Sequence, residues 1–343
     1  ASRLRNPRPR NKRRSKLMFV HASYRVGRKK RKAVLLALGA LLLTLVVACG
    51  GGPKNTLPPR LTEVKRLAAE GSYWFQRGCF GRAERYFSQA LEASRLVDDL
   101  EEMVRAYNNL GAVALVQGHY VEAGEHLQKA LEFNDLLKSA REEAFALGNL
   151  GSLAFKAGRY QEAEELWEKA LVVAKNNPQK SGFAMHLNNL GMLRRKQGRL
   201  EEAESLLKRA LARAESSGYK PTMANSHMQL GLVAEAQGDF ARAEKQLSRA
   251  LEIDKAAENT IGIAQDLEQI GRLRQQQQLW EKAFLDLDRA IRLYGALGKT
   301  EKVSQLYELL ETNKAQGEVP ESLEPYEGLL VPPDDFWESP LCR

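Results

Sequence analysis

The sequence predicts an all-α fold, a solenoid of six helix-turn-helix units followed by a cap helix. Glycines recur every forty residues with no insertion between them, and two alanine columns follow the same period. Each interval also carries two amphipathic stripes with helical spacing. The glycines are Gly71, Gly111, Gly151, Gly191, Gly231 and Gly271. Because one such unit cannot bury its apolar face alone, the units are expected to stack.

The N-terminal segment has the pattern of an export signal. Residues 1–32 hold fourteen Lys and Arg and no acid, so the net charge of +9 belongs to this arm, and the remainder is net −5. Ala33–Ala48 is uncharged and is followed by Cys49. Its sixteen residues are short for a membrane span, which needs ~20, but suit the apolar region of a signal peptide. "VVAC" resembles the lipobox of bacterial lipoproteins, in which the cysteine is lipidated.

We therefore expect residues 1–48 to be a basic arm and lipoprotein signal peptide, with translation starting at Met18. Residues 49–60 would be a tether lipidated at Cys49. Gly50 follows Cys49 in place of the aspartate that retains many lipoproteins at the inner membrane. This favours a bacterial cell envelope location, at the outer membrane facing the periplasm. Two alternatives stay open: an uncleaved single-pass anchor, and nucleic-acid binding by the arm, although no nucleic acid is expected.

The six units are expected at residues 61–100, 101–140, 141–180, 181–220, 221–260 and 261–300. In the second unit Gly118 lies between the two helical stripes, where a left-handed residue can end a helix and reverse the chain. Gln278 replaces this glycine in the sixth unit, so an atypical turn is expected there. A glycine within a helix costs ~1 kcal/mol relative to alanine. The motif glycines are therefore expected to face alanines of the partner helix, allowing close approach.

Residues 61–300 resemble the tetratricopeptide repeat family. The family pattern is matched in the second unit at Tyr107, Leu110, Gly111, Ala114, Ala123, Leu127 and Ala130. The period is forty residues instead of thirty-four, as in the kinesin light chain-like branch. The resemblance implies a right-handed superhelix. Residues 301–317 then form a cap helix, and residues 318–343, acidic and rich in proline, a flexible tail.

The resemblance also implies that the first helix of each unit lines a concave, peptide-binding surface. Amides recur two residues before the motif glycine, and two of them follow a further asparagine. One interpretation is hydrogen bonding to the neighbouring unit. The other, which the kinesin light chain-like branch favours, is a ladder that binds the backbone of an extended peptide. The amides are Asn108, Asn109, Asn149, Asn188, Asn189, Gln229 and Gln269.

Four basic residues are expected on the same surface, where they would favour acidic peptides or a free carboxylate. They are Arg105, Lys156, Arg195 and Lys196. The alternative is that each is an ordinary solvated charge. The predicted partners are thus proteins or peptides, with a membrane contact through lipidated Cys49.

No catalytic motif is found: the chain lacks a phosphate-binding loop, a zinc-protease motif and a nucleophile elbow. The five histidines have no metal-ligand spacing. We therefore expect a scaffold and not an enzyme, with no cofactor, no metal and no small-molecule substrate. A repeat-bearing enzyme subunit is the alternative. Whether Cys79 pairs with Cys342 is open.

Overall fold

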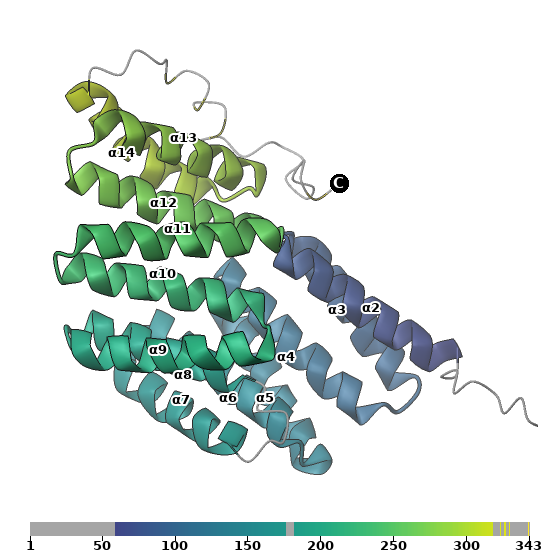
Figure 1. Ribbon diagram of the computed structural model, residues 1–343. Coiled ribbons are helices and arrows are strands. Elements are labelled where there is room, and N and C mark those ends of the chain that lie inside the picture. The colour runs from purple at the N-terminus through teal and green to yellow at the C-terminus, as the bar shows by residue number, and fades with distance from the viewer. Residues whose placement is uncertain are drawn as a thin grey trace, which may run out of the picture. The chain divides into compact units, whose positions relative to one another are not determined.

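The computed structural model describes residues 59–175 and 182–317, together with Leu323, Tyr326, Leu329 and Cys342. These ranges hold thirteen helices and no strand (Figure 1). The basic arm, the apolar segment and Cys49 lie outside the described residues. No helix within the described part of the chain has the length and apolarity needed to cross a bilayer.

The helices follow one another as pairs, one pair for each forty-residue unit, and α14 comes last (Figure 1). The fold class predicted from the sequence is thus confirmed. The bounds are α2 Pro59–Gln76, α3 Phe80–Arg95, α4 Leu100–Gln117, α5 Tyr120–Leu137, α6 Ala140–Lys156, α7 Tyr160–Lys175, α8 Phe183–Lys196, α9 Leu200–Ser217, α10 Lys220–Ala236, α11 Phe240–Ala256, α12 Thr260–Gln276, α13 Trp280–Ala296 and α14 Thr300–Gly317.

The turn within each unit reverses the chain through one left-handed residue. Gly118 has φ of 88°, as predicted, and the His119 N–H donates to the carbonyl of Ala114 at 2.9 Å. The expectation of an atypical turn in the sixth unit was wrong. Gln278 adopts φ of 59°, and the Leu279 N–H donates to Arg274 at 2.9 Å. The same hydrogen bond holds this turn although a non-glycine residue is disfavoured there.

The motif glycines make room for a large residue of the partner helix, sixteen positions later in the chain. A Cβ atom on Gly191 would lie 2.6 Å from Cγ of Leu207, and one on Gly151 would lie 2.6 Å from Trp167. The predicted alanine also contacts the glycine, but through its backbone: the Ala203 carbonyl would be 3.4 Å from the added atom. The alanines therefore allow the close approach, and the large side chain fills the space opposite the glycine.

Polar residues also lie between successive units. Asp254 of α11 and Asp266 of α12 are both buried, and Asn259 Nδ2 donates to Asp254 at 3.0 Å. Burial raises the pKa of Asp266 to about 8 and that of Asp254 to about 6, and the negative charge of Asp254 raises the pKa of Asp266 further. A Cβ atom on Gly262 would overlap the carboxylate of Asp254, so glycine at this position leaves room for the acid pair.

The first unit contacts the fifth and sixth units directly, at a junction we call the seam. The turn between α2 and α3 supplies one side: Arg77 forms an ion pair with Glu258, and a Cβ on Gly78 would lie 3.0 Å from Leu297. Lys299 Nζ lies 4.7 Å from the ring centre of Phe80. Contacts between distant units are not required by the nearest-neighbour stacking of a solenoid.

A disulfide joins Cys79 to Cys342 across this seam, with 5.5 Å between the Cα atoms. Tyr326 is buried in the core formed by α12, α13 and α14, and its hydroxyl donates to Asp288 at 2.5 Å. Leu329 lies against Gly295. The expectation of a flexible tail is therefore corrected at these residues, because apolar burial and a covalent bond fix them to the helices. The rest of the tail lies outside the described residues.

Candidate binding groove

A groove of about 530 Å³ runs across the first helices of the first three units. Tyr219, in the turn that precedes α10, also lines the groove and is 55% exposed. The lining residues are Lys65, Ala68, Ala69, Ser72, Glu102, Arg105, Asn108, Asn109, Arg141, Glu142, Phe145, Asn149 and Tyr219. First helices thus supply most of the lining of this groove.

The asparagines three residues before the motif glycine are buried and join neighbouring units. Asn108 Nδ2 donates to the carbonyl of Glu142 at 3.1 Å. Asn188 Nδ2 donates to the carbonyl of Thr222 at 3.3 Å, and Ser226 donates to Asn188 Oδ1 at 2.9 Å. Both acceptor carbonyls lie thirty-four residues further along the chain. For Asn108 and Asn188, the structure therefore favours hydrogen bonding to the next unit.

The amides two residues before the glycine are placed differently. Asn109 and Asn149 are half-buried and line the groove, and the structure gives their side chains no hydrogen-bond partner among the described residues. Asn189 and Gln269 are also half-buried, but they lie outside the lining of this groove. Gln229 is buried, and its Oε1 has no partner in the described part of the chain. The structure thus brings together two of the five amides in this column.

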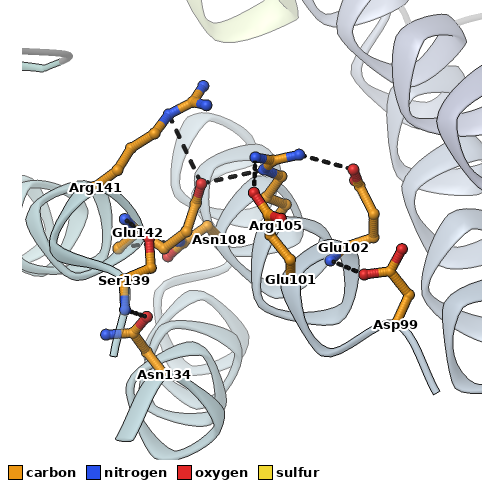
Figure 2. A network of polar contacts seen from close by, with 9 residues as sticks. All are labelled: Asp99, Glu101, Glu102, Arg105, Asn108, Asn134, Ser139, Arg141 and Glu142. Carbon is orange, nitrogen blue, oxygen red and sulfur yellow. Dashed lines mark hydrogen bonds and ion pairs between the residues drawn. The ribbon is translucent and has the colours of Figure 1, made fainter. Parts of the chain in front are cut away.

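Arg105 belongs to the groove lining. Its guanidinium lies among glutamates, as Figure 2 shows. It forms ion pairs with Glu101, with Glu102 at 2.7 Å and with Glu142 at 3.2 Å. Arg141 approaches Glu142 from the other side at 3.7 Å (Figure 2). Arg105 therefore does not support the predicted preference for acidic peptides, because three carboxylates already offset its charge.

The other three predicted cations lie outside this groove. Lys156 and Lys196 are exposed at the C-terminal ends of α6 and α8, and Lys196 Nζ lies 5.3 Å from the ring centre of Tyr160. Arg195 is half-buried, and burial lowers the pKa of its guanidinium. The structure thus leaves Lys156 and Lys196 as solvated charges, the alternative that the sequence left open.

Two aromatic residues of the groove, Phe145 and Tyr219, were not predicted from the sequence. Phe145 lies forty residues after Arg105, so the repeat register contained the signal that would have found it. Tyr219 lies at the boundary between the fourth and fifth units, directly before α10, and also lines the groove. Nothing in the forty-residue period indicates that contact.

A stack of helical hairpins with an open groove along its first helices defines a helical-repeat protein, a class that binds partners on extended surfaces. A profile of the tetratricopeptide repeat family matches residues 71–135, 142–216 and 182–256, more than half of the chain. The chain therefore belongs to the tetratricopeptide repeat family. Its fold and family make it a protein-interaction scaffold for protein or peptide partners.

The chain is similar to solved structures of other proteins. A Rap protein complexed with Competence and Sporulation Factor is 17% identical and aligns over 76% of this chain and 77% of its own, with a TM-score of 0.54. BtubC (BKLC) from P. vanneervenii is 21% identical over 64% of this chain and 92% of its own, with a TM-score of 0.49. At this identity, the likeness to the Rap protein shows the fold alone. No curated protein matches the sequence.

Proposed function

We propose that the chain is a membrane-anchored scaffold whose groove binds an extended segment of a partner protein. One observation carries the proposal: Asn109 and Asn149 present half-buried amides on one groove surface, without partners among the described residues. A carboxamide both donates and accepts, so two in a row match the alternating N–H and C=O groups of an extended backbone. Phe145 and Tyr219 add apolar contact area beside them.

The charge of the groove supports a partner segment without a strong net charge. Lys65, Arg105 and Arg141 face Glu102 and Glu142 in the lining, so cations and anions nearly balance. Binding energy would then come from backbone hydrogen bonds and apolar contacts. Dependence on salt concentration is expected to be weak because few charges are neutralised on binding.

The anchor is the second part of the proposal. The basic arm, the apolar segment and Cys49 have the order of a lipoprotein signal, with lipid attached to Cys49. The disulfide between Cys79 and Cys342 supports a location outside the cytoplasm, because disulfides persist in oxidising compartments. We place the scaffold at the cell envelope, facing the periplasm, where it would assist assembly of an envelope complex.

Replacing Cys49 by serine should release the protein from membranes, as measured by fractionation and by mass spectrometry of the lipidated peptide.

The groove is tested by site-specific photo-cross-linking in intact cells. A photoreactive residue at Ala69, which lies in the groove lining, should capture a partner for mass spectrometry. The variant Asn109→Ala with Asn149→Ala should reduce this capture at least ~10-fold, because two backbone-binding amides are lost. Gln128→Ala is the matched control, since it removes an exposed amide from α5. Equal capture by all three proteins would contradict the proposal.

A second comparison separates binding from folding. Asn188→Ala should lower the free energy of unfolding by ~1–2 kcal/mol, because it breaks buried hydrogen bonds to the next unit. The adjacent Asn189→Ala should change it by less than ~0.5 kcal/mol. Chemical denaturation measures both values.

A further inference from the structure

The seam encloses a second pocket, of about 390 Å³, which we call the seam pocket. The first unit forms one wall with Phe75, Phe80 and Phe87, and Pro221 and Ile261 lie in the opposite wall. The complete lining is Ser72, Phe75, Gln76, Phe80, Phe87, Asn109, Ala112, Val116, Tyr219, Pro221, Ala257, Asn259, Ile261 and Gln265. None of these lining residues is charged, whereas the groove lining holds five charged residues.

The seam pocket is continuous with the groove. Ser72, Asn109 and Tyr219 line both. An extended peptide held by the Asn109 amide would therefore pass the seam pocket, and one of its side chains would point toward it, because side chains alternate along an extended backbone.

We propose that the seam pocket is a specificity pocket for one large apolar side chain of the bound peptide, aromatic or branched aliphatic. This inference rests on the proposed function, because the groove must hold the peptide backbone. The lining favours such a side chain: aromatic and aliphatic walls reward apolar area removed from water, and a charged side chain would be buried without a partner of opposite charge. Pockets with mainly apolar walls and a few amides are typical of specific ligand sites.

Fixed walls add to the selectivity of the seam pocket. Cys79 precedes Phe80 and is bonded to Cys342, and Gly78 packs against Leu297 and Ile261. The seam pocket is thus formed before the peptide binds. On binding, the peptide side chain loses conformational entropy, but the protein loses little.

The test uses short random peptides selected on the purified, disulfide-bonded protein, with affinities measured by fluorescence anisotropy. Selected peptides should share one large apolar residue at a fixed position. Changing that residue to alanine should weaken binding ~10-fold, and changing it to glutamate by more.

Variants of the protein place the effect in the seam pocket. Val116 is 45% exposed and lines the seam pocket, so the variant Val116→Glu should fold normally. It should bind the selected peptides at least ~10-fold more weakly than the unmodified protein. It should also prefer peptides with lysine at the fixed position. Val172→Glu is the matched control, since Val172 is an exposed valine of α7. Ala112→Phe is a second variant, expected to fill the seam pocket and exclude the apolar side chain.

The outcomes distinguish this inference from the proposed function. Peptides that require Asn109 and Asn149, yet share no apolar position and bind Val116→Glu normally, would overturn the specificity pocket and leave the groove in place. Binding that survives loss of both asparagines but fails in Val116→Glu would support the seam pocket and contradict the amide ladder. Failure of every peptide to bind would contradict both.

Discussion

The motif glycines of this chain are required by the large residue that faces each of them. In every unit, a Cβ atom added to the glycine would lie only 2.6–2.8 Å from the side chain of the residue sixteen positions later. Real Cβ contacts are longer, so even a methyl group forces either the helix pair or the large side chain to move. Trp167 is the largest of these residues and is fully buried beneath Gly151. The helix-weakening glycine is thus compensated by a well-filled contact.

Replacing one of these glycines by alanine should therefore destabilise the protein. Gly191→Ala is expected to lower the free energy of unfolding by ~1–3 kcal/mol, because its methyl group would overlap Leu207. Gly124→Ala is the control, because its methyl group would lie 3.6 Å from Leu153, which is an ordinary contact. Alanine is a better helix former than glycine, so this variant should raise the free energy of unfolding by ~1 kcal/mol. Urea denaturation measures both. Stabilisation of both variants would show that the glycines are not constrained by packing.

The forty-residue period predicted which residues of a helix face the core, but it did not separate neighbouring amides. Asn108 and Asn109 differ by one step of about 100° around the helix axis, and that step decides whether the side chain meets the next unit or the groove. The period alone does not fix the angle between successive units. The period also did not show that the charge of Arg105 is offset, because Glu142, one of its ion-pair partners, comes from the following unit.

The contact between helices α11 and α12 contains a pair of acidic residues. The equivalent contacts between other units contain uncharged residues at these positions. Asp254 and Asp266 occupy the positions that Asn134 and Ala146 occupy at the contact between α5 and α6. Oδ2 of Asp266 has no hydrogen-bond partner in the described part of the chain. With its raised pKa, Asp266 keeps its proton at neutral pH, so the pair carries one negative charge instead of two.

This contact should make stability fall as pH rises. The pKa of Asp266 is about 8 in the folded state and near 4 when unfolded, so only the folded chain keeps this proton at neutral pH. The stabilisation that comes from this bound proton is present at low pH and is lost as pH rises toward 8. Between pH 6.5 and 8.5 the free energy of unfolding should fall by ~1–2 kcal/mol. Denaturation at several pH values measures it.

The variant Asp266→Asn should flatten this pH profile, whereas Asp135→Asn, at an exposed position of α5, should keep it. The window avoids lower pH because burial lowers the pKa of His186 to about 4. That group acts in the opposite direction, since its contribution is lost as pH falls from about 6.5 toward 4. A profile that is the same in Asp266→Asn and in the unmodified protein would contradict the assignment.

Across the whole molecule, the seam joins units that nearest-neighbour stacking leaves apart. The disulfide links residues separated by 263 positions, and Tyr326 and Leu329 hold the chain against α13 on the way. The sequence left the pairing of these cysteines open. It contained no signal for the contacts of Gly78 with Ile261 and Leu297, because such contacts depend on the pitch of the superhelix.

Breaking the disulfide should loosen the first unit selectively. Cys342→Ser is expected to lower the free energy of unfolding by ~2–5 kcal/mol, because a long loop is no longer closed. Hydrogen exchange should become faster in α2 and α3, while α7–α10 should change little because their stability comes from adjacent units. Treating the unmodified protein with a dithiol reductant should reproduce the pattern. Exchange that becomes faster in all helices alike, or that does not change in any helix, would show that the disulfide does not hold the seam together.

The seam also bears on how a chain of this kind changes in evolution. Repeat arrays usually gain or lose a unit by duplication or deletion of one gene segment, and the remaining contacts survive because each unit touches only its neighbours. Here one unit more or fewer would displace Cys342 and Leu297 from the turn that carries Cys79. Descendants of this protein that retain the two cysteines are therefore expected to vary in side chains and to retain the number of units.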